Sequence, residues 1–222
     1  MPARDPKDRL IVALDVGTLD EAAALLDRLQ GVVGAWKIGS QLFTASGPTA
    51  AELVQKRGGS VFLDLKFHDI PSTVAGAVRE ATRLGVFMLN VHASGGSPML
   101  KAAAEAARQA AREFSVPKPL CLAVTVLTSL DRALLQRELN VPLSVEGHVI
   151  HLAGLARAAG LDGSICSPQE TRAVRNALGR EWVIVTPGVR PTGSEAGDQA
   201  RVSTPEKAIR SEERRVGKEC RL

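Results

Sequence analysis

Short apolar runs alternate with segments of helical spacing along most of the chain. Residues 61–65 are apolar apart from one Asp, and residues 98–114 repeat small apolar side chains every three or four positions. The first pattern is typical of strands buried on both faces, and the second of amphipathic helices. Seven strands are predicted, at residues 10–14, 35–38, 61–65, 88–91, 120–126, 163–166 and 182–186. Helices are predicted at residues 20–29, 48–57, 71–84, 98–114, 145–159 and 169–178, with one short helix within 131–142.

These strand-then-helix units, with their short connections, predict a parallel sheet covered by helices. The positions of the polar side chains decide between an open sheet and a closed barrel. They follow the predicted strands: Asp15, Lys37, Asp64, Lys66, His92, Thr128 and the loop after Thr186. In a closed barrel the C-terminal ends of the strands meet in one mouth, where such residues form a single site. We therefore predict an α/β fold of the TIM (β/α)8-barrel type.

The densest group of charges follows the third predicted strand. Side chains alternate along a strand, so Phe62, Asp64 and Lys66 share one face. Asp69 follows in a turn, and Pro71 suits the first turn of a helix because its fixed φ is already helical. This grouping predicts a functional site at the end of the strand.

Two simpler interpretations compete with a functional one. Asp64 and Lys66 could form an ordinary exposed ion pair, which contributes little to stability. Asp69 could serve only as a turn or cap residue, since Asp favours both positions. The apolar run before them favours the functional interpretation, because charges at the end of a buried strand are costly unless they are paired.

The amino-acid composition argues against several classes of function and of site. Only 3% of the residues are aromatic and none is Tyr, which argues against modules that bind nucleic acids by base stacking. The net charge is +4, but half of it lies in residues 210–222, so the remaining body suits a small anionic ligand. The three cysteines lack the paired spacing of a zinc site or a disulfide framework. With a charged N-terminus and no apolar run long enough to span a membrane, the chain is expected to be cytoplasmic.

The motifs resemble those of the orotidine 5′-phosphate decarboxylase family, over about residues 10–209. The motif Asp-Leu-Lys-Phe-His-Asp-Ile-Pro-Ser-Thr at 64–73 carries most of the resemblance. Its companions, in order, are Ala-Leu-Asp15, Trp-Lys37-Ile-Gly, Asn-Val-His92-Ala, Val-Thr-Val-Leu-Thr128-Ser, Thr-Pro-Gly-Val-Arg190-Pro and Gly-Asp-Gln199-Ala-Arg-Val. The resemblance implies a single barrel domain at residues 1–209 that converts orotidine 5′-monophosphate to uridine 5′-monophosphate, without a cofactor or metal.

The resemblance also implies roles for individual residues. Lys66 would donate the proton, and Asp64 would stand beside the substrate carboxylate. Asp69 and Thr73 would reach into the partner's site of a homodimer. The other expected substrate contacts are Asp15 and Lys37 to the ribose hydroxyls, Thr128 to the pyrimidine, and Arg190 and Gln199 to the phosphate. His92 is expected to be structural support, and His148 and His151 to be surface residues.

Loss of CO2 from the pyrimidine ring leaves a carbanion that no cofactor delocalises. Fixed charges must therefore stabilise it and then protonate it. Lys66 can do both, because two flanking carboxylates favour its charged form. Asp64 can also repel the substrate carboxylate. Of these two contributions to catalysis, stabilisation of the carbanion is expected to be the larger.

Residues 210–222 depart from the family. The family pattern continues to a Gly-x-Asp turn, an eighth apolar strand and a Gly-Arg pair that grips the phosphate. Here residues 210–222 form a charged tail with no apolar run suited to a strand. We therefore expect seven recognisable strands, with the eighth replaced by a non-family tail.

Two other functions stay open from the sequence. A metal-dependent decarboxylase or aldolase acting on a sugar phosphate shares the Asp-x-Lys-x-x-Asp strand end. A chain that binds nucleotide or dimerises without turnover would follow from an incomplete phosphate site. Metal dependence separates the first from the leading hypothesis, and binding without turnover identifies the second.

Overall fold

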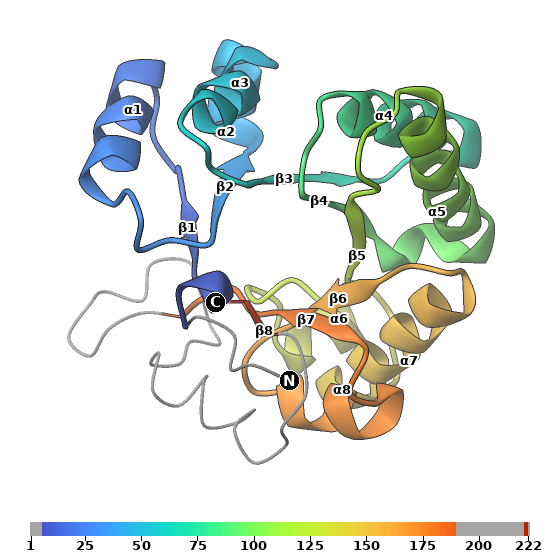
Figure 1. Ribbon diagram of the computed structural model, residues 1–222. Helices are drawn as coiled ribbons and strands as arrows, with labels where there is room; N and C mark the ends of the chain where they lie inside the picture. Colours follow the sequence, from blue (N-terminus) through green and yellow to red (C-terminus); the bar gives the residue numbers. More distant parts are fainter. Residues whose placement is uncertain (1–5, 190–219, 222) are drawn as a thin grey trace.

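The structure, a computed structural model, describes residues 6–189 and 220–221. Parallel strands pair in the order β1 to β8, and the sheet curls with helices on its outer side (Figure 1). The strands are β1 Ile11–Ala13, β2 Ala35–Gly39, β3 Val61–Phe67, β4 Met88–His92, β5 Leu120–Val124, β6 Gly163–Ile165, β7 Val183–Val185 and β8 Cys220–Arg221. The helices are η1 Pro6–Arg9, α1 Leu19–Arg28, α2 Ser40–Ser46, α3 Thr49–Lys56, α4 Pro71–Arg83, η2 Ala93–Gly95, α5 Gly96–Glu113, α6 Arg132–Arg137, α7 Val145–Ala158 and α8 Thr171–Leu178. This is an α/β fold of the TIM type.

Alternation along the strands builds two apolar cores. On β3, Val61 and Leu63 pack in the core between sheet and helices, while Phe62 packs in a separate cluster. That second cluster fills the concave side of the sheet with Phe62, Met88, Leu122, Val124, Ile165, Val183 and Val185. Because both faces of the sheet are apolar, the strands read as nearly continuous hydrophobic runs in the sequence.

The seven predicted strands are confirmed, and the short helix expected within 131–142 is α6. One helix was missed. The sequence prediction passed directly from the second strand to a helix at 48–57, but α2 begins at Ser40, immediately after β2. Gly47, with φ of 57°, ends α2 before α3 starts, so α2 is an additional helix that precedes the predicted one.

The eighth strand position is occupied by two residues of the tail. Cys220 and Arg221 pair in parallel with Ile184 and Val185 of β7. β8 also lies near η1 at the other end of the sheet (Figure 1). The remaining tail residues lie outside the described part of the chain. The sequence predicted seven strands and a tail, and the structure adds the two-residue strand β8.

No helix within residues 6–189 is long and apolar enough to cross a membrane.

Candidate active site

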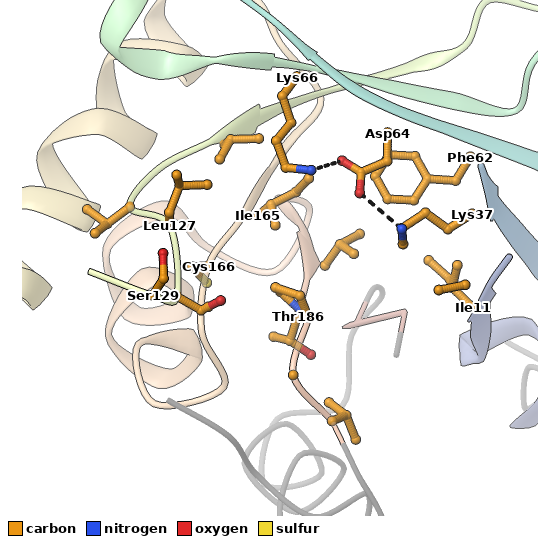
Figure 2. A pocket seen from close by; sticks show the side chains of 18 of the residues that line it. Ile11, Lys37, Phe62, Asp64, Lys66, Leu127, Ser129, Ile165, Cys166 and Thr186 are labelled. Carbon is orange, nitrogen blue, oxygen red and sulfur yellow. Dashed lines mark hydrogen bonds and ion pairs between the residues drawn. The ribbon is translucent and has the colours of Figure 1, made fainter. Parts of the chain in front are cut away.

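A cavity of about 570 Å3 lies at the C-terminal ends of the strands (Figure 2). Four predicted charged residues line it: Asp15 after β1, Lys37 on β2, and Asp64 and Lys66 on β3. Thr128, from the segment after β5, lines it as well. The sequence prediction that these side chains meet at one mouth is therefore confirmed for these five positions.

The four charged side chains form a row of alternating sign. Lys66 Nζ lies 2.7 Å from Asp64 Oδ1, and Lys37 Nζ lies 3.5 Å from Asp64 Oδ2. Lys37 Nζ also donates to Asp15 Oδ1 at 2.9 Å. Figure 2 shows Asp64 between the two ammonium groups at the edge of the cavity. The row carries two positive and two negative charges, so each charge has an opposite neighbour.

Asp64 is 8% exposed and is the most buried member of the row. Burial raises its pKa, but the charges of Lys66 and Lys37 and the hydrogen bonds from Lys66 and Asn90 act more strongly together. The net result is a pKa below the usual value for an aspartate. Asp64 is therefore a carboxylate at neutral pH despite its burial.

Asn90 belongs to the site and was not predicted. Its Nδ2 donates to Asp64 Oδ1 at 2.6 Å, and its Oδ1 accepts from the Lys66 backbone N–H at 2.8 Å. It is fully buried on β4. The sequence offered one signal, a polar residue inside an otherwise apolar strand, because such a residue needs hydrogen-bond partners.

The rest of the cavity lining is mostly apolar. It includes Ile11, Ala13, Phe62, Val124, Val126, Leu127, Ile165, Val185, Pro187 and Val189, with polar groups at Ser129, Cys166 and Thr186. A planar, uncharged ring could pack against the apolar side while its reacting edge meets the charges. Charges in such partly dry surroundings interact more strongly than they do in water.

Two predicted residues lie away from this cavity. Asp69, before α4, and Thr73, in its first turn, are exposed and are not among the residues that line it. Asp69 Oδ1 accepts from the backbone N–H of Ile70 at 2.6 Å. Within this one chain the structure does not bring either residue to the charge row. Arg190 and Gln199 lie outside the described residues.

His92 ends β4 beside this site. Its ring centroid lies 5.2 Å from that of His68. Burial, with the nearby charges of His68 and Lys66, lowers the pKa of His92, while Asp64 opposes the shift. His92 does not line the cavity. Of the two helical histidines, His151 is exposed as expected, whereas His148 is half-buried and stacks on it at 6.3 Å.

Comparisons with known proteins settle the family. A family model described as "Orotidine 5'-phosphate decarboxylase / HUMPS family" matches residues 8–214. The chain belongs to this family. An orotidine 5'-phosphate decarboxylase of Moorella thermoacetica is 57% identical over 204 residues, which cover 92% of this chain and 81% of that protein. One from Nostoc sp. is 47% identical, covering 92% and 85%.

A solved structure agrees with this family membership. The crystal structure of orotidine 5'-phosphate decarboxylase from Lactobacillus acidophilus superposes with a TM-score of 0.78 at 34% identity, covering 91% of this chain and 86% of that one. An uncharacterised conserved protein from Geobacillus kaustophilus superposes with a TM-score of 0.77 at the same identity. Within the described residues, no group of three or more His, Cys, Asp or Glu side chains is placed to hold a metal ion.

Proposed function

We propose that this chain decarboxylates orotidine 5′-monophosphate to uridine 5′-monophosphate, with Lys66 protonating the carbanion at C6. The observation that carries the proposal is the row of alternating charges facing an apolar cavity. Asp64 and Lys66 are 2.7 Å apart in that row, and both line the cavity. Membership of the family supports the same reaction.

The chemistry follows from the row. When the bond from C6 to the carboxylate breaks, the electron pair stays on C6 and CO2 leaves. The Lys66 ammonium stabilises that pair and then transfers a proton to it, forming the new C–H bond. Asp64 holds the ammonium in place, and its negative charge also disfavours the bound carboxylate relative to neutral CO2.

The other predicted residues would hold the rest of the nucleotide. Asp15 and Lys37, hydrogen-bonded to each other, present polar groups for the ribose hydroxyls. Thr128 lines the same cavity and would contact the pyrimidine. Arg190 and Gln199 would bind the phosphate, where the planar guanidinium offers two parallel donors to phosphate oxygens.

Decarboxylation can be followed by the loss of orotidylate absorbance in chelator-treated buffer. The protein should turn over substrate without added metal, and Lys66→Ala should abolish turnover. Lys101→Ala, which removes an exposed lysine from α5, is the matched control and should keep full activity. Full activity in Lys66→Ala would rule out the proposed role of that residue.

The same assay separates the alternatives. Turnover that requires a divalent metal would indicate the sugar-phosphate class of chemistry. Binding of uridine 5′-monophosphate in calorimetry, together with no turnover of orotidylate in the assay, would identify a chain that binds nucleotide without catalysis. Either result would overturn the proposed function.

We also propose that the working form is a homodimer in which Asp69 and Thr73 complete the partner's site. Both residues are exposed and lie off the cavity of their own chain, which leaves them free to act elsewhere. Mixing Lys66→Ala with Asp69→Ala should then create some sites with both native residues. Activity should partly return, and verified mixed dimers without any recovery would place Asp69 in its own subunit's site.

A cytoplasmic location completes the proposal. Cys121 is a buried thiol in no disulfide within the described structure. Thiols left unpaired are typical of proteins that work in a reducing compartment.

A further inference from the structure

The pairing of β3 with β4 is interrupted at the two central charges. Leu63 pairs with Leu89, and the next pair joins Phe67 to Val91. Three residues of β3, from Asp64 to Lys66, therefore lie opposite the single residue Asn90. Such a bulge re-aims side chains, and the extra residues lose their ladder partners.

Lys66 is strained inside this bulge. Its φ is 52°, in the left-handed region that residues other than Gly, Asn and Asp seldom adopt. A residue in this region persists where its surroundings enforce it, and such residues gather at functional sites. The bulge also takes the backbone N–H of Lys66 out of the ladder, so that donor needs another acceptor.

Asn90 makes two hydrogen bonds to the residues of the bulge. Its Oδ1 accepts from the Lys66 N–H at 2.8 Å, and its Nδ2 donates to Asp64 Oδ1 at 2.6 Å. The orientation of the amide is decided by its partners, because a backbone N–H can only donate and an ionised carboxylate can only accept. A flipped amide would face each partner with the wrong group.

We infer that Asn90 is a positioning residue for the proposed decarboxylation, fixing the Lys66 backbone and the Asp64 carboxylate relative to each other through one side-chain amide. The inference rests on the proposed function. Asp64 Oδ1 accepts from both Asn90 Nδ2 and Lys66 Nζ, while Oδ2 faces Lys37 at 3.5 Å. Asn90 thus positions the proton donor Lys66 in two ways. It accepts from the Lys66 backbone N–H, and it donates to Asp64, the carboxylate that binds the Lys66 ammonium group.

The amide is the group that the position requires. Leu has a similar volume but can neither accept nor donate. An ionised Asp can accept from Lys66 but faces Asp64 with a like charge. Because Asn90 is fully buried, water cannot easily replace the lost partners.

The test compares Asn90→Leu and Asn90→Asp with the wild type and with Thr82→Val. Thr82 is also fully buried, and its hydroxyl donates to Val78 O within α4, so its variant loses a buried hydrogen bond away from the cavity. In Asn90→Leu we expect kcat to fall about 100-fold, the effect of displacing a reacting group by roughly 1 Å. KM should change less than about threefold, since the groups expected to bind substrate remain. Thr82→Val should keep the wild-type kcat.

The pH profile of Asn90→Asp supplies a second measurement. The new carboxyl group would face Asp64 and Lys66 from β3, Lys37 from β2, and His92 on its own strand. Two adjacent carboxyl groups hold one proton tightly, and the protonated group can donate to Asp64 as the amide does. We expect kcat of this variant to fall as the pH rises and that shared proton is lost, a step absent from the wild-type profile.

The outcomes separate the inference from the function on which it rests. A wild type that turns over orotidylate, with Asn90→Leu within about threefold of its kcat, overturns the positioning role alone. If Asn90→Leu does not fold, an Asn90→Asp profile identical to the wild type overturns it instead. A wild type without turnover overturns the proposed function and this inference together.

Discussion

Asp64 shows how a buried charge is stabilised at the C-terminal end of a strand. Two ammonium groups and the Asn90 amide surround it, so its oxygens have partners in place of water. Removing one partner of such a group costs more than the interaction itself contributes, because the remaining charges stay buried. The residues of the row therefore depend on one another, and single substitutions there are not expected to be additive.

His92 should make folding sensitive to acid. Its pKa is lowered in the folded protein, chiefly by burial, so the unfolded chain binds more protons as the pH falls. The stability from neutral His92 is present above the unfolded pKa of about 6.5 and is lost as the pH falls through the lower folded value. Urea unfolding at about pH 7.5 and about pH 5 should show a larger loss of stability in the wild type than in His92→Gln.

The other histidines do not obscure this comparison. The pKa of His148 is lowered too, by burial and by His151, so it adds an acid sensitivity of the same sign. That contribution is common to the wild type and to His92→Gln, and it cancels in the difference between them. An equal loss of stability in both proteins would contradict the prediction.

The sequence located the charged residues but not what holds them. Alternation along β3 placed Asp64 and Lys66 on one face, and Lys37 was expected at the same mouth because it lies near the end of a strand; all three line the cavity. Asn90 was missed because its contacts depend on the bulge, which arises from the pairing of β3 with β4. Asn90 and Lys66 are 24 positions apart in the chain, and a local pattern does not show such a contact.

Among the elements, the connection between α8 and β7 is bound by a buried arginine of α8. Arg175 Nη1 donates to the carbonyls of Gly179, Arg180 and Trp182, at 2.9, 3.0 and 2.6 Å. These carbonyls belong to the connection after the helix, where backbone acceptors lack helical partners. Arg175 is 7% exposed, so water would not easily replace it.

Arg175→Met keeps part of the aliphatic stem and removes the donors. We expect the free energy of unfolding to fall by about 2 to 4 kcal/mol, because one buried hydrogen bond, to Trp182 O, and two part-buried ones, to Gly179 O and Arg180 O, lose their charged donor. Arg172→Met is the matched control, since Arg172 lies exposed on the same helix, and it should change stability by less than about 0.5 kcal/mol. Urea unfolding measures both, and equal effects would show that the buried contacts contribute nothing.

Element boundaries followed local signals where those were strong. Pro71 marked the start of α4 correctly, and α6 lies within the segment that was expected to contain one short helix. The sequence failed at α2, because its start at Ser40 follows β2 with no connecting loop. The N-cap there is Gly39, whose lack of a side chain gives no capping signal.

At the scale of the whole molecule, neighbouring strands of the sheet differ in the length over which they pair. β4 and β5 pair over five residue pairs, whereas β7 and β8 pair over two. The barrel type was predictable because the strand-then-helix pattern repeats over most of the chain. The pairing of Cys220 and Arg221 was not, because a two-residue strand leaves no apolar run in the sequence.

Replacing residues 210–222 with a segment of the family pattern should stabilise the protein and raise its activity. An eighth strand of alternating apolar residues would extend the pairing along β7 and reduce the exposure of strand edges, which favour aggregation. A Gly-Arg pair after it would add a charge-assisted contact to the substrate phosphate, contributing about 1.5 to 3 kcal/mol. That corresponds to about one to two decades in kcat/KM. Thermal unfolding, solubility and kcat/KM of the two chains test this.

A third chain separates the two effects. It carries the same replacement strand with Gly-Ala in place of Gly-Arg. Because the strand acts on folding and the arginine on the phosphate, both replacement chains should melt at the same higher temperature, but only the one with arginine should gain the full increase in kcat/KM. Asp64 and Lys66 would not substitute for the added arginine, since in the proposed reaction they act on the ring and not on the phosphate. Equal stability and equal kcat/KM in all three chains would show that the present residues 210–222 already serve both purposes.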